Sequence, residues 1–140
     1  MMEDRPPPRL TRLTGGEKRP YQAYATVRNG QAWTLEIRYA RGEQWEGVFL
    51  PYHLLRPVEY TGHQRLLLPS TELLVSLEGR YLDATLDLLR DQRLSCLQQF
   101  HAWFFTAPEG SDTVITAVHV TPRLAEPAFP NRRAPAREEA

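Results

Sequence analysis

The longest amphipathic pattern in this chain runs over residues 81–104. At about 100° per residue, its apolar side chains fall on one narrow stripe, which comprises Leu82, Leu86, Leu89, Cys96, Leu97, Phe100 and Phe104. Polar side chains such as Asp83, Asp87 and Asp91 fall on the opposite side. The pattern predicts one helix over residues 81–104, straight or bent, that buries its apolar stripe.

The middle of this segment interrupts the pattern. Arg93 falls on the apolar stripe, at the end of the polar run 90–93. A charged side chain aimed at an apolar contact must reach an edge or find a partner. Besides one bent helix, two further interpretations therefore stay open: two shorter helices, or a segment 94–100 that leaves the helix altogether.

The residues before this segment alternate with the period of two that is typical of half-buried strands. Residues 21–28 and 33–39 alternate on either side of Asn29-Gly30. This dipeptide favours a tight hairpin turn because both residues tolerate a positive φ. We expect a two-stranded hairpin here, with Trp33 on its core face and Tyr24 on its outer face.

Further strands are predicted over residues 45–50, 65–68, 72–78 and 113–120. The path of residues 51–60 stays open between a short strand and an irregular crossing. Short turns between consecutive strands favour an antiparallel meander. The predicted fold class is therefore α+β: a mostly antiparallel sheet or half-open barrel of about five to six strands, packed against one long helix.

The two ends of the chain differ from its middle in composition. Eight of the twelve prolines lie in residues 1–20 and 121–140. We predict flexible Pro/Arg-rich tails at 1–20 and 123–140 around a single domain at 21–122. The start has no apolar h-region, and no apolar run is long enough for a membrane span. We therefore expect a soluble cytoplasmic protein without membrane contact, and the near-absence of lysine beside abundant arginine indicates a bacterial source.

No segment shows the pattern of a catalytic, metal-binding or cofactor-binding motif. The four histidines lack the spacing that places two imidazoles on one metal, and the serines and glycines form no known catalytic or phosphate-binding motif. The single cysteine, Cys96, lies on the apolar stripe without an adjacent base. We expect a protein that is not an enzyme and that uses no metal and no cofactor.

The predicted helix has more apolar surface than one sheet face needs. Leu88, Leu94 and Phe105 leave the main stripe, and Tyr24 lies on the outer face of its predicted strand. Exposed apolar and aromatic groups are typical of protein interfaces. The principal prediction is a non-enzymatic interaction module that forms a homodimer or binds a protein partner through Leu88, Leu94, Phe105 and Tyr24.

Two alternative functions depend on arginines. Arg28 and Arg38 lie on the outer face of the predicted hairpin, where arginine and tyrosine can hold phosphates and stack bases. Together with the arginine-rich tails they favour a nucleic-acid-associated protein, although the net charge of zero and Glu36 on the same face count against it. The other alternative is a small-ligand-binding domain with a pocket between helix and sheet, where Arg93 is the candidate contact.

Overall fold

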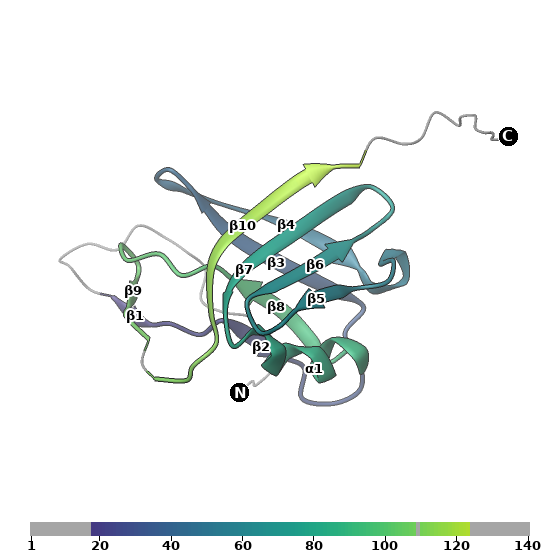
Figure 1. Cartoon of the computed structure of the whole chain (residues 1–140), viewed down its shortest axis with the longest axis horizontal. Coiled ribbons are helices and arrows are strands. Elements are labelled where there is room, and N and C mark those ends of the chain that lie inside the picture. The colour runs from purple at the N-terminus through teal and green to yellow at the C-terminus, as the bar shows by residue number, and fades with distance from the viewer. Residues whose placement is uncertain (1–17, 109, 124–140) are drawn as a thin grey trace, which may run out of the picture.

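A computed structural model describes residues 18–108 and 110–123 of the chain (Figure 1). Strands account for 52% of the described residues and helices for 11%, so the protein is mostly β. Most strand pairs are antiparallel, as predicted, but the sheets do not close into a barrel. Within the described residues, no helix is long and apolar enough to cross a bilayer.

Two four-stranded sheets form the body of the protein. The first has the order β10-β7-β6-β5 and consists of β5 (Glu59–Thr61), β6 (Arg65–Pro69), β7 (Leu73–Arg80) and β10 (Val114–Pro122). The second has the order β2-β8-β3-β4 and consists of β2 (Tyr24–Thr26), β3 (Thr34–Arg41), β4 (Gln44–Pro51) and β8 (Leu94–Gln98). The short strands β1 (Arg19–Pro20) and β9 (Phe105–Thr106) pair in parallel beside them.

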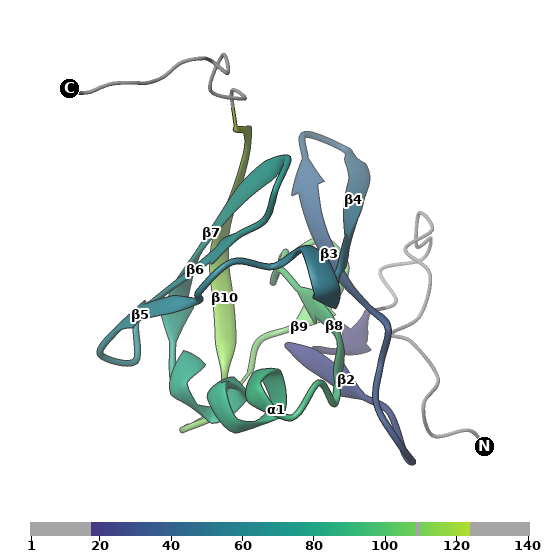
Figure 2. The same ribbon diagram turned by 90° about the vertical axis from the view of Figure 1, so that its right-hand side faces the viewer.

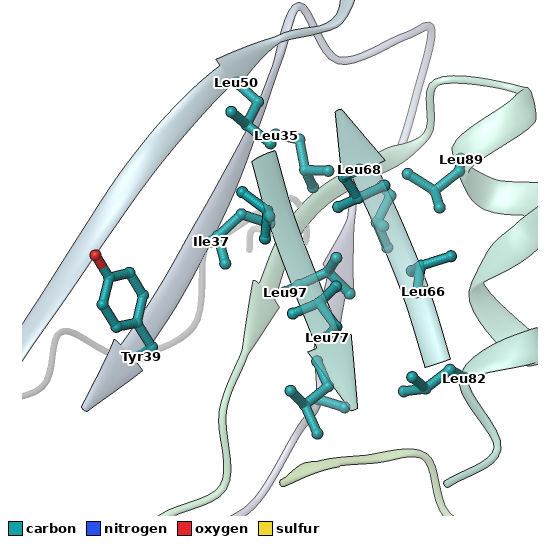
Figure 3. Close-up of a cluster of buried hydrophobic side chains, with 14 of the residues drawn as sticks. Leu35, Ile37, Tyr39, Leu50, Leu66, Leu68, Leu77, Leu82, Leu89 and Leu97 are labelled. Carbon is teal, nitrogen blue, oxygen red and sulfur yellow. The ribbon is translucent and has the colours of Figure 1, made fainter. Parts of the chain in front are cut away.

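The core lies between the two sheets, whose strands cross steeply in Figure 1. Every second residue of β3 is buried, including Leu35 and Ile37. These side chains point towards Leu66 and Leu77 of the opposite sheet (Figure 3). Burying a leucine or isoleucine side chain contributes about 1.5–3 kcal/mol, so this alternation stabilises the face-to-face packing of the sheets.

The only helical segment longer than one turn in the described part closes one end of the space between the sheets (Figure 2). It consists of the 3₁₀ turn η2 (Leu82–Thr85) and α1 (Leu86–Arg90), and Leu82 and Leu89 point from it into the core. A further 3₁₀ turn, η1 (Tyr52–Leu54), follows β4. A helix thus covers the core, as predicted, but it is far shorter than predicted.

The prediction of one helix over residues 81–104 is wrong, because the helix ends at Arg90. Gln92 adopts a left-handed backbone with a φ of 58°. Its N–H donates to the carbonyl of Leu89 at 3.1 Å, and the N–H of Arg93 donates to the carbonyl of Leu88 at 2.8 Å. This pair of hydrogen bonds is the Schellman motif, which terminates helices. The interpretation in which the segment leaves the helix is therefore the one observed, and residues 94–98 form β8.

The predicted hairpin around Asn29-Gly30 is also wrong, because β8 lies between its two strands. β8 runs antiparallel to β2 and parallel to β3. On either side of the turn, Val27 donates its N–H to the carbonyl of Arg93 at 2.9 Å, and Ala32 donates to that of Gln92 at 2.7 Å. The backbone N–H groups expected to bond across the hairpin are thus taken by the residues that lead into the inserted strand.

Two side chains at this place lie opposite to the predicted faces. Trp33 precedes β3 and is 87% exposed rather than part of the core. Tyr24 is the register partner of Leu97 and is partly buried against the core rather than on an outer face. Both errors follow from the inserted strand, because the faces were assigned for a direct β2–β3 pairing.

Other parts of the prediction are confirmed. Strands β4, β6, β7 and β10 contain or overlap the segments 45–50, 65–68, 72–78 and 113–120, and β5, β6 and β7 form an antiparallel meander. Residues 51–60 contain both alternatives that stayed open, an irregular crossing and the start of a short strand. β1 lies within the segment assigned to the N-terminal tail, and the predicted tails at 1–17 and 124–140 lie outside the described residues.

Candidate functional site

A groove of about 450 Å³ lies between α1 and the chain that leads from η1 into β5. Six of its lining side chains are aromatic or aliphatic, and three are polar. They are Tyr52, Leu55, Val58, Tyr60, Leu86 and Leu89, with Asp87, Arg90 and Gln92. Ligand sites in proteins are concave, mostly apolar and of about 300–1,000 Å³, so this groove has the size and lining of such a site.

The tyrosine of η1 that lines the groove, Tyr52, is buried and uncharged. Its hydroxyl donates a 2.6 Å hydrogen bond to the carbonyl of Leu94. Burial raises the pKa of this phenol to about 12. The hydroxyl therefore stays protonated, and its proton is already donated to Leu94. A ligand can contact the ring of Tyr52 rather than its oxygen.

The wall opposite the helix is an extended segment tied to the turn between β6 and β7. Leu55 forms an isolated bridge with Ser70, and the N–H of Arg56 donates to the carbonyl of Pro69 at 2.7 Å. Further along this wall, Tyr60 is 60% exposed at the mouth of the groove. These contacts hold the wall in place, whereas the ring of Tyr60 stays accessible to a ligand.

The polar side chains of the rim largely compensate one another. Asp87 and Arg90 form an ion pair of 3.0 Å, and Arg90 also lies 3.6 Å from Asp91. All three side chains are more than half exposed, where such pairs contribute little energy. Gln92 adds an uncharged amide that can donate and accept hydrogen bonds. The rim is therefore suited to orient a ligand, whereas most of the binding energy would come from the apolar lining.

Replacing Gln92 with glycine is expected to stabilise the fold by about 0.5–1 kcal/mol. A left-handed backbone costs an L-residue about 1–2 kcal/mol, which exceeds the entropy that glycine loses on folding. Urea unfolding of Gln92→Gly and wild type measures the difference. An unchanged or lowered midpoint would contradict it and would show that the glutamine side chain stabilises the fold through its own contacts.

The candidate interaction residues lie largely within the core. Leu94 is fully buried and Phe105 is 2% exposed. Leu88 and Tyr24 are partly buried and pack against the hydrophobic core. These four residues therefore form no continuous exposed surface in this structure, because the helix that was expected to present Leu94 and Phe105 does not extend to them.

The three candidate arginines do not form one site, although Arg93 contacts the backbone of Arg28. Arg38 lies on β3 and forms an ion pair of 3.2 Å with Glu36, whereas Arg28 is exposed beyond the end of β2. Arg93 lies outside the groove, where its guanidinium donates to the carbonyls of Val27 at 3.0 Å and of Arg28 at 3.4 Å. The prediction that the Arg93 side chain points into an apolar interface is wrong, because the helix has already ended before this residue.

Leu55, Val58 and Gln92 line the groove, although no sequence pattern identifies them as candidate site residues. Residues 51–60 do indicate an irregular crossing, because they contain two prolines and their apolar side chains do not keep a period of two.

Among the described residues no group of His, Cys, Asp or Glu side chains is placed to hold a metal ion. Comparison of the chain with protein-family models, curated proteins and solved structures finds no significant match.

Proposed function

We propose that the protein binds a small, mainly apolar molecule in the groove between α1 and residues 52–60. The observation that carries this proposal is the groove itself, in which Leu55, Val58 and Leu86 stay partly exposed beside the exposed ring of Tyr60. An apolar concavity of this size, with a few polar groups at its rim, is the typical form of a ligand site.

The lining favours a ligand of a particular kind. Tyr60 offers an accessible ring face, while Leu86 and Val58 offer aliphatic contacts on opposite walls. The two charged lining residues, Asp87 and Arg90, pair with each other, so a strongly charged ligand gains little there. A flat aromatic or aliphatic body with one hydrogen-bonding group, held by Gln92, fits these features best.

Binding of the dye 1-anilinonaphthalene-8-sulfonate, an anion with an apolar aromatic body, tests the proposal. We expect saturable fluorescence enhancement with wild type and about tenfold weaker binding with Tyr60→Ala, because an exposed ring face contributes about 1–1.5 kcal/mol to such a contact. Trp103→Ala is the matched control, since Trp103 is a similarly exposed aromatic residue (56%) that does not line the groove.

Thermal unfolding of each variant is measured alongside the titration, because the same dye also binds loosely packed states. Equal affinity in Tyr60→Ala and wild type, with both cooperatively folded, would contradict the proposal. Absence of any saturable binding to wild type would contradict it as well.

A further inference from the structure

Among the described residues, no strand pairs with the outer side of β4, the outermost strand of the second sheet (Figure 2). It follows β3 through a two-residue turn in which Gly42 has a φ of 62°. Phe49, near its far end, is 66% exposed. An open edge that carries an exposed large apolar side chain favours pairing with another strand, so its backbone groups decide which partner fits.

The register of the β3–β4 hairpin shows which backbone groups face outward. In a two-residue hairpin the residues that flank the turn exchange both backbone hydrogen bonds, and bonded pairs then recur at every second position. Arg41 is the partner of Gln44, so β4 bonds β3 through its even-numbered residues. The N–H and C=O groups of Trp45, Gly47 and Phe49 therefore point to the open edge.

Pro51 supports this assignment. It belongs to the same odd-numbered set, so the N–H that it lacks would also have faced outward. Proline is tolerated in strands where its missing donor is not needed by the neighbouring strand. The open edge is thus defined by the sequence of β4 as well as by its register.

We propose that two copies of this chain pair through β4, antiparallel across a two-fold axis that passes beside Gly47. Gly47 then pairs with Gly47 of the second copy, and Trp45 pairs with the other copy's Phe49 at both ends. All of these are outward-facing residues, so each pair can exchange both backbone hydrogen bonds. The second sheet becomes one continuous sheet across the dimer.

The side chains of β4 fit this register. Trp45, Gly47 and Phe49 share the outer face, where two aromatic cross-strand pairs flank a glycine centre. Trp45 is already fixed by Phe104 of its own chain at a ring distance of 5.3 Å. Glu46 is neutralised within its own copy by Arg41 at 3.2 Å, so no unpaired charge meets the second copy.

The other open edges are less suited to a partner strand. β2 and β5 have three residues each. The start of β10 is already bonded at its outer side, because Phe100 donates to the carbonyl of Ile115 and the Gln99 side chain donates to that of Thr116. Only its part from Ala117 to Pro122 is left, which is shorter than the eight residues of β4. Since an edge must offer a run of free backbone groups, β4 is the edge that fits a second copy.

Sedimentation equilibrium of the full chain tests the proposal, with Phe49→Lys as the variant. We expect wild type to sediment at twice the 16.2 kDa of one chain and Phe49→Lys as a monomer, because a charge at an edge opposes strand pairing. Tyr60→Lys is the control, since it changes an exposed aromatic residue of the other sheet in the same way and leaves the dimer intact.

The register is tested in wild type, without any variant. In this pairing the α-protons of Glu46 and of Val48 from the other copy face each other at a non-bonded position. An isotope-filtered nuclear Overhauser contact between them is the expected result. A monomeric wild type, a dimeric Phe49→Lys or a dimer without this contact would each overturn the proposal, and a monomer would leave the ligand groove unaffected.

Discussion

Gly79→Ala is expected to destabilise the protein by ~3 kcal/mol, at the upper end of the cost of overpacking a core. A β-carbon at Gly79 would overlap the carbonyl oxygen of Val114 and lie 2.9 Å from the carbonyl carbon of that residue. It would also lie 3.0 Å from the Cα of Ile115. All three are backbone atoms of a buried stretch, so they cannot move aside as a flexible side chain can.

The close approach at Gly79 results from a β-bulge. The pairing of β10 with β7 shifts register between Ile115 and Ala117, directly opposite Gly79. Bulges bring the two backbones close together, and glycine is the residue that allows this. An alanine there must separate the longest strand pair of the first sheet or displace buried Val114 and Ile115.

Urea unfolding measures this effect, with Thr116→Ala as the control. Thr116 lies in the same bulge but is exposed, so its replacement is expected to cost less than 1 kcal/mol. A Gly79→Ala variant as stable as Thr116→Ala would show that the two backbones do not approach each other as described.

Stability is expected to fall steeply as the pH rises above about 9, because three buried acidic groups are kept neutral by the fold. Burial raises the pKa of Cys96 to about 12, while the charge of Arg38 lowers it and that of Glu36 raises it to a smaller extent. Burial also raises the pKa of Tyr52 to about 12 and raises that of Tyr21. Each group is protonated in the folded chain well above its ordinary pKa.

The free energy of unfolding falls with rising pH because the unfolded chain loses these protons before the folded chain does. Below the ordinary pKa of these groups both states are neutral, and the stabilisation is fully present. Above it the unfolded chain releases protons that the folded chain keeps, so the free energy of unfolding falls by about 1.4 kcal/mol per pH unit for each group. The loss continues up to the raised pKa values, and across two pH units it approaches the whole stability of about 5–15 kcal/mol typical of a domain.

Urea unfolding over a series of alkaline pH values measures this slope. In Cys96→Ala, the free energy of unfolding is expected to fall less steeply at the lower end of this pH range, where only the thiol titrates. Tyr60→Phe, which removes an exposed phenol, is the control and is expected to leave the slope unchanged. A stability that stays constant up to about pH 11 would contradict the burial of these groups.

The sequence predicts those strands whose two faces differ. In β3, Leu35 and Ile37 are buried while Thr34 and Glu36 are partly exposed, and this contrast produces the alternation. β8 shows no such contrast between its two faces. It is an interior strand, and Leu94, Cys96 and Leu97 are all buried. A short apolar run of this kind has no period that separates a strand from a helix, so β8 extended the helical pattern.

The end of the helix carries no sequence signal, because its left-handed residue is Gln92 rather than the glycine typical of that position. The insertion of β8 between β2 and β3 depends on contacts between residues far apart in the chain, which Asn29-Gly30 cannot reveal. The groove depends on the same kind of contact. Leu86 was predicted to pack on a sheet, but its position opposite Val58 follows from the crossing of residues 51–60 between the sheets.

The central claim is that the groove beside α1 takes a small apolar ligand, and a nuclear magnetic resonance titration of the full chain with 1-anilinonaphthalene-8-sulfonate tests it most directly. We predict saturable shifts of backbone amides at Leu55, Val58, Leu86 and Leu89, which line the groove, while amides of β10 stay unchanged. Saturable shifts centred elsewhere, or none at all, would contradict the claim.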